Sequence, residues 1–309
     1  MPHINRFISI PAYLAAFAIV GGLQIRPGFA TLTIGNSPVA EDDDIFNQLT
    51  ANGSDSLASE ICSNMIASSE TFTIGDVSKA QLHINVRKEI VSTINRMYGG
   101  GPIDFALPTT YAVYPSSGII FQSTNPKATK PTLGMKVLPG VRTSDAVVEI
   151  LNNPTRTGCE QAQIAAYLIA HRNIYGDAWI NAKIPPGTLV IDVIHKFAVR
   201  SADETTYIPG DIIFMTNKKD YKRKVELSPH YNPKKVYVWT GENTIYAGGG
   251  TTRTNGLFDG LGISPMSEAQ LRARLKSGYE TDTELPPLSD DDANANIKFN
   301  FFARVKIQP

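Results

Sequence analysis

The order of its periodic segments constrains the fold of this chain more than any other feature: helical patterns come first and strand patterns follow. Residues 80–97 place Ile90, Val91, Ile94 and Met97 on one face at helical spacing, and glycines from position 99 end the pattern. After Gly176 the pattern changes to short strands, expected at residues 188–194, 211–215, 236–239 and 244–247. This order predicts the α+β class, with an antiparallel sheet flanked by helices.

Three more helices and one more strand are expected outside these segments. Ser144 is suited to cap one helix, and Thr157 and Glu160 have the spacing of a capping box for the next. A short helix is expected over residues 268–276. The alternating tail, residues 297–307, predicts a half-buried strand that docks on the sheet.

Composition changes divide the chain into four parts. Residues 1–30 read as a signal peptide, and residues 31–79 form a polar extension that we expect to be loosely ordered. Residues 80–285 hold the periodic segments and form the main domain. Residues 286–309 combine a polar linker with the C-terminal strand.

The N-terminus has the three features of a secretory signal. A short positive start precedes an apolar run over residues 7–23, and Gly28 and Ala30 supply the small residues of a cleavage site. A short anchor helix is the alternative, which Pro11 disfavours. We therefore expect removal near Ala30, a secreted or periplasmic protein, and no stable membrane span afterwards.

The charge balance and the cysteine count exclude several classes of protein. The chain has 29 basic and 29 acidic residues, so no general attraction to nucleic acid is expected. Two cysteines, Cys62 and Cys159, are too few for a disulfide-rich scaffold or a cysteine-based zinc site. In an oxidising compartment the two could pair with each other, which would be a structural role for both.

Cys159 and Glu242 are the residues whose local setting suggests chemistry. A thiol in the first turn of a helix ionises more readily, because free N–H groups and the helix dipole stabilise negative charge there. Glu242 lies between two apolar strands, where burial would raise the pKa of its carboxyl. Each also has an ordinary interpretation: Cys159 as a small buried apolar residue, and Glu242 as a solvated turn residue.

Several motifs, taken in order, resemble the bacterial spore-type transglutaminase family. The pieces are residues 144–150 (SDAVVEI), the helix around Cys159, 207–214 (YIPGDIIF), 239–243 (WTGEN), 260–263 (GLGI) and 275–278 (LKSG). The resemblance covers residues 130–280 and implies a papain-like α+β core related to NlpC/P60 hydrolases. It also implies that Cys159 is the nucleophile and that Glu242 is its carboxylate partner.

The chain departs from the family pattern at two positions. The family has Glu directly before its cysteine, where this chain has Gly158, and His before the Gly-Leu-Gly-Ile run, where it has Asp259. Since no histidine follows His230, the matching segment offers no Cys–His pair. If Asp259 lies near Glu242, it could raise the pKa of that carboxyl and complete the catalytic set.

The resemblance implies a protein-glutamine gamma-glutamyltransferase, which joins glutamine and lysine side chains of protein substrates without a metal or cofactor. Two alternatives remain open at this stage. One is a glutamine deamidase or an NlpC/P60-like amidase, and the other is an exported binding protein that keeps the fold without activity.

Overall fold

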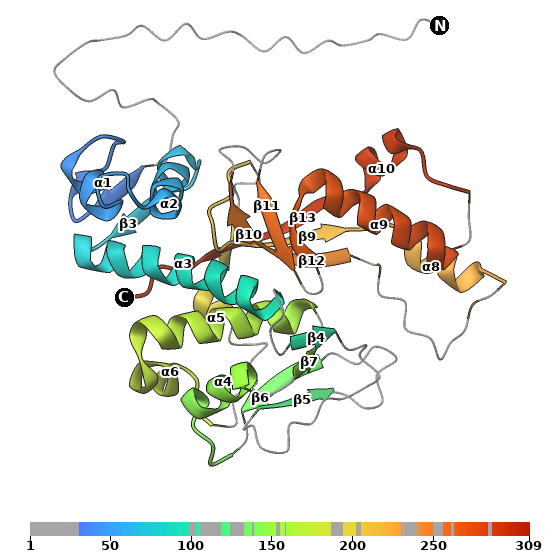
Figure 1. Cartoon of the computed structure of the whole chain (residues 1–309), viewed down its shortest axis with the longest axis horizontal. Helices are drawn as coiled ribbons and strands as arrows, with labels where there is room; N and C mark the ends of the chain where they lie inside the picture. The colour runs from blue at the N-terminus through green and yellow to red at the C-terminus, as the bar shows by residue number, and fades with distance from the viewer. Residues whose placement is uncertain are drawn as a thin grey trace, which may run out of the picture.

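The computed structural model describes residues 31–309 with gaps at 99–102, 106–118, 124–132, 138, 153–154, 158, 187–193, 202–204, 230, 232–238, 240, 250–255, 261–262 and 284–285 (Figure 1). The helices are α1 (Asp44–Leu49), α2 (Ser56–Ala67), α3 (Val77–Tyr98), α4 (Thr143–Asn152), α5 (Cys159–Tyr175), α6 (Asp177–Lys183), α7 (Ile194–Phe197), α8 (Tyr221–Leu227), α9 (Glu268–Thr283) and α10 (Asp290–Asn296). The strands are β1 (Leu32–Ile34), β2 (Ser37–Pro38), β3 (Phe72–Ile74), β4 (Ile103–Phe105), β5 (Ile119–Ser123), β6 (Leu133–Val137), β7 (Thr155–Thr157), β8 (Ala198–Arg200), β9 (Ile212–Thr216), β10 (Gly241–Gly248), β11 (Leu257–Gly260), β12 (Ile263–Ser267) and β13 (Lys298–Val305).

A six-stranded sheet forms the centre of the fold, in the order β12-β11-β10-β9-β13-β8. Every neighbouring pair in it is antiparallel. The C-terminal strand β13 inserts between β8 and β9, so the alternating tail docks on the sheet as expected. The α+β class with an antiparallel sheet and flanking helices is confirmed.

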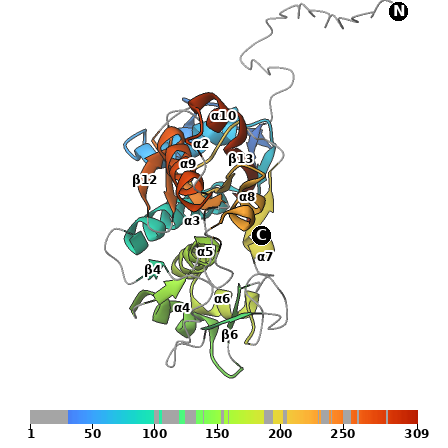
Figure 2. The same cartoon turned by 90° about the vertical axis from the view of Figure 1, so that its right-hand side faces the viewer.

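Helices cover both faces of this sheet. The antiparallel neighbours α3 and α5 lie side by side along one face (Figure 1, Figure 2). Their apolar side chains, including Ile90 and Leu168, form one core cluster together with Ile245 of β10. On the other face, Leu271 and Leu275 of α9 pack with Ile213, Met215 and aromatic residues of the sheet.

The N-terminal segment is folded, which corrects the expectation of a loosely ordered extension. A three-stranded sheet in the order β2-β1-β3 packs with α1 and α2, and Leu32, Phe46 and Ile61 lie in its apolar cluster. Aspartates cap both helices, since Asp43 accepts from Phe46 N and Asp55 accepts from Ala58 N. The acidic run at 41–44 therefore includes a helix start.

A buried ion pair joins α3 to the turn before β9. The Arg87 guanidinium donates to Asp211 Oδ1 at 2.8 Å and to the Pro209 carbonyl at 3.0 Å, and its Nε donates to His83 Nε2 at 2.9 Å. Arg87 is fully buried, so these contacts replace the hydrogen bonds to water that its guanidinium loses on folding. Gly210 adopts φ +93°, and a Cβ there would meet the Arg87 backbone at 3.3 Å, so the close approach favours glycine.

Three local expectations differ from the structure. Thr157 is the last residue of β7, paired with Phe105 of β4, so it does not cap α5. Helix α4 begins at Thr143 rather than after Ser144. The linker contains the helix α10, capped by Ser289.

Several sequence expectations fall on residues outside the described part of the chain. They are the signal peptide over 1–30, the strand at 236–239 and most of the strand at 188–194. No helix among the described residues is both long and apolar enough to cross a membrane.

Candidate active site

Cys159 is the first residue of α5, the long helix that packs against β10. It is partly exposed and packs against the core cluster shared by α3, α5 and β10. The other cysteine, Cys62, is fully buried in α2, and both thiols are free. The disulfide that would have given both cysteines a structural role is absent from this pair.

The Cys159 sulfur is held by N–H donors and faces a negative group. Asn243 Nδ2 donates to Sγ at 3.3 Å, and the backbone N–H groups of Asn243 and Glu160 also stabilise the thiolate. Burial acts in the opposite direction, and so does the charge of Glu242. Together they raise the pKa of the thiol to about 11.

Glu242 is buried near the start of β10, next to Asn243. Burial raises the pKa of its carboxyl to about 8, and the charge of Arg274 on α9 opposes this rise. Among the described residues, Oε1 has no hydrogen-bond partner. Glu242 is close enough to affect the Cys159 thiol electrostatically, although no hydrogen bond joins these two described side chains in this state.

Asp259 lies on the face of the sheet that meets α5. It is the register partner of Ile245, and residues opposite each other in an antiparallel pair share one face. Asn243, two residues before Ile245, points to the same face, whereas Glu242 starts from the other, beside its β9 partner Met215. The sheet therefore places Asp259 on the side of Asn243 and Cys159.

The Asp259 carboxyl is fully buried, and neither of its oxygens has a hydrogen-bond partner in the part of the chain that the structure describes. Burial raises its pKa to about 6. Burial is likewise the main cause of the raised pKa of Glu242, for which we had expected a contribution from Asp259.

The structure describes the side chains of two histidines, and each of them has a polar contact away from the Cys159 thiol. His83 accepts from Arg87, and His171 Nδ1 lies 2.7 Å from the Tyr167 carbonyl within a group of stacked aromatic rings. His171 is twelve residues along α5 from Cys159, which corresponds to about 18 Å. Neither histidine contacts the thiol.

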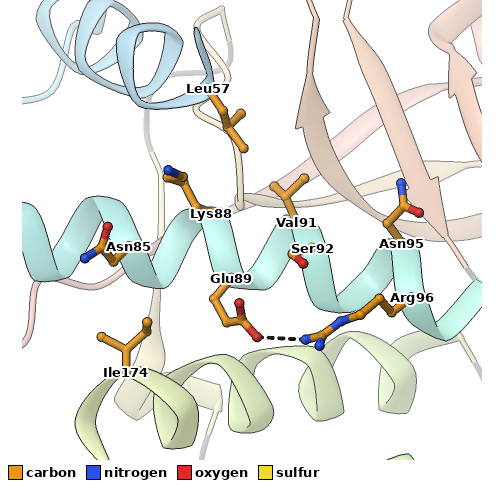
Figure 3. Close-up of a pocket in the computed structure, with 9 residues that line it drawn as sticks. All are labelled: Leu57, Asn85, Lys88, Glu89, Val91, Ser92, Asn95, Arg96 and Ile174. Atoms are coloured by element: carbon orange, nitrogen blue, oxygen red, sulfur yellow. Dashed lines mark hydrogen bonds and ion pairs between the residues drawn. The ribbon is translucent and has the colours of Figure 1, made fainter. Parts of the chain in front are cut away.

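A cavity lies elsewhere, over α3. This cavity of about 610 Å³ is lined by seven residues of α3, with Leu57 of α2 and Ile174 of α5 at its edges (Figure 3). Two of these lining residues, Glu89 and Arg96, form an ion pair of 2.7 Å (Figure 3). None of Cys159, Glu242 and Asp259 lines it, and the described residues contain no group of three metal-binding side chains.

The residue that sequence reasoning missed is Asn243. Its sequence position directly after Glu242 was the available signal, but a Gly-Glu-Asn turn does not show which of the two polar side chains reaches a helix 84 residues earlier. In the structure, the Asn243 side chain donates a hydrogen bond to the Cys159 sulfur, and Glu242 lies close enough for its charge to act on the Cys159 thiol.

Comparisons with known proteins identify the family and the fold of the chain. Residues 32–285 match the family model of protein-glutamine gamma-glutamyltransferase. The match therefore starts at the folded N-terminal segment, well before the region where the motifs resemble the family. No curated protein sequence matches the chain.

A solved transglutaminase from Geobacillus stearothermophilus, without its C-terminal extension, has a similar fold. Its TM-score is 0.51 at 18% identity, over 74% of this chain and 93% of that one. This likeness confirms the expected papain-like fold. Because the family model spans most of the chain, the protein belongs to the protein-glutamine gamma-glutamyltransferase family of protein-crosslinking transferases.

Proposed function

We propose that this chain is an exported transglutaminase that forms a thioester between Cys159 and a glutamine side chain and passes the acyl group to a lysine amine. The observation that carries this proposal is the position of Cys159: a partly exposed thiol at the start of α5, with N–H donors on its sulfur and an acid within electrostatic range. Asp259 is the third member of the proposed catalytic set.

In the first half of the reaction, the Cys159 sulfur attacks the glutamine carboxamide carbon while its proton passes to Glu242. The backbone N–H of Cys159 at the helix start would stabilise the oxyanion. Glu242 then returns the proton to the departing nitrogen, so the C–N bond breaks, ammonia leaves and a thioester remains.

In the second half, the lysine amine attacks the thioester carbon and loses a proton to Glu242. The C–S bond breaks, the thiol is restored and an isopeptide remains. Water in place of the amine would give glutamate, so deamidation is the competing outcome of the same intermediate.

The raised pKa of Glu242 supports its role in proton exchange. An exposed glutamate would be too weak a base for a thiol, whereas burial brings the pKa of this carboxyl to about 8. Hydrogen bonds that serve catalysis are often long without substrate and shorten once it binds. We expect the Cys159 thiol and the Glu242 carboxyl, which already interact electrostatically, to form a direct hydrogen bond when glutamine binds.

The test uses a glutamine-bearing protein, a fluorescent primary amine and mass spectrometry to detect both amine incorporation and deamidation. We expect Cys159→Ala to abolish incorporation and Glu242→Ala to lower it at least about tenfold. Full labelling by Cys159→Ala would refute the assignment of the nucleophile. Ammonia release without incorporation by the wild type would identify a deamidase instead.

A further inference from the structure

The environment of the Cys159 sulfur contains more acids than cations. Glu242 of β10 raises the pKa of the thiol, Glu160 is the next residue on α5, and Asp259 of β11 lies on the face that meets α5. Among the described residues, Arg274 of α9 is a cation whose charge acts on Glu242. A thiolate at this position therefore needs stabilisation from neutral groups.

Asn243 is the side chain placed to give that stabilisation. Its Nδ2 lies 3.3 Å from Sγ, the distance of a hydrogen bond to sulfur. The side chain points from β10 toward α5 on the same face as Ile245, which packs in the core cluster with α5. The β10–β9 register, with Asn243 opposite Phe214, fixes the backbone at this point.

We propose that Asn243 is a catalytic residue that stabilises the Cys159 thiolate through its side-chain amide, in a site where no described imidazole does so. This inference rests on the proposed function. When the thiol proton passes to Glu242, the sulfur becomes an anion, and the Nδ2–H bond becomes a charge-assisted one. It is then stronger than the bond to the neutral thiol, so it favours ionisation.

The effect of this hydrogen bond on the reaction rate of the Cys159 thiol can be measured. A hydrogen bond to a charged group changes an ionisation equilibrium by about tenfold to a hundredfold. A less stabilised thiolate is also a stronger nucleophile, which offsets about half of that change on a logarithmic scale. Removing the amide should therefore slow thiol–disulfide exchange at Cys159 roughly 3- to 10-fold at mildly alkaline pH.

The experiment measures the exchange rate with the uncharged disulfide dithiodipyridine as a function of pH, in the full chain with Cys62→Ser as background. Cys62 is fully buried, so this change removes a second thiol without touching the site. Asn243→Ala should show the expected loss. Asn243→Asp keeps the shape but replaces the donor with a carboxylate, so it should react more slowly still.

Asn181→Ala is the matched control, because Asn181 is also partly buried and donates through its side chain, at 3.0 Å to Ser144 Oγ on a different helix. It should react at the wild-type rate, and urea unfolding checks that each variant is folded. Wild-type exchange rates in folded Asn243→Ala and Asn243→Asp across the pH range would overturn the proposal.

The exchange reaction needs no glutamine substrate, so the two proposals can fail separately. A wild-type chain that incorporates no amine would refute the proposed function and leave the exchange result standing. An Asn243 variant with full exchange rates would refute the role of Asn243 and leave the transglutaminase assignment in place.

Discussion

Replacing Glu242 by glutamine is expected to stabilise the fold, and to do so mainly at alkaline pH. The pKa of this carboxyl rises from 4.5 in an exposed glutamate to about 8 in the folded chain, chiefly because of burial. The folded state therefore binds a proton more tightly than the unfolded state. Stability from this group is fully present below the lower pKa and is lost as the pH rises toward the higher one.

The size of the effect follows from the same two values. One pKa unit corresponds to 1.36 kcal/mol, so the full difference is about 5 kcal/mol, of which about 4 kcal/mol falls between about pH 5 and about pH 9. Glutamine has nearly the same shape and does not ionise. Its stabilising effect should thus be small near pH 5 and should approach about 4 kcal/mol near pH 9.

Urea unfolding of both chains at the two pH values, followed by tryptophan fluorescence, measures this difference. Glu226→Gln, at a largely exposed position on α8, is the control and should show no comparable pH-dependent gain. A Glu242→Gln variant whose stability relative to wild type is the same at both pH values would refute a buried carboxyl with a raised pKa. The proposed proton exchange with Cys159 would then lose its basis.

Two further predictions concern activity and stability separately. Asp259→Ala should lower amine incorporation less than Glu242→Ala does in the same assay, because the Asp259 carboxyl has no hydrogen-bond partner among the described residues; an equal loss would show that Asp259 is as essential to the catalytic set as Glu242. Asp211→Ala should lower the free energy of unfolding by about 3–5 kcal/mol, since it leaves the buried Arg87 charge unpaired, while Asp145→Ala, which breaks an exposed pair with Arg142, should cost at most about 1 kcal/mol. Similar losses in these two variants would show that the Arg87 charge is solvated or paired elsewhere.

Elements with strong periodicity could be predicted from the sequence because their pattern is local. The spacing of Ile90, Ile94 and Met97 located α3, and the alternation after residue 297 located β13. Each pattern reflects one face buried against the core, and the structure buries the expected side chains. The motif order was also sufficient to predict the family that the comparison confirms.

Expectations failed where tertiary contacts compete with a local signal. Thr157 has the spacing of an N-cap, but its backbone pairs with β4, so the strand extends almost to Cys159. The segment after residue 31 looked loosely ordered because charged residues surround few apolar ones. Leu32, Ile34 and Phe46 nevertheless meet residues of α2 in one cluster, which no local window contains.

The candidate site shows the same limit. Cys159 and Glu242 were identifiable from motifs, but the contact between Asn243 and the sulfur depends on how α5 packs against β10. Strand alternation relates Asn243 to Asp259 only once the β10–β11 register is known. Side-chain alternation can be read from a sequence, whereas the register between two strands depends on the turn that joins them and on which face is buried.

In the proposed mechanism, the Cys159 thiol reacts without an ion pair at rest. In a Cys–His pair, the imidazolium stabilises the thiolate before substrate reacts. In this chain, burial favours the neutral forms of both Cys159 and Glu242. A neutral resting pair avoids a buried charge, but Glu242 must first lose its own proton before it can accept the proton of the Cys159 thiol. Only then does the sulfur become an anion. At that moment the N–H groups around Sγ, which are neutral dipoles already in place, stabilise the new charge without having to reorganise. The same arrangement links stability and activity: the carboxyl that destabilises the fold as the pH rises is the one that must lose its proton for the thiol to react.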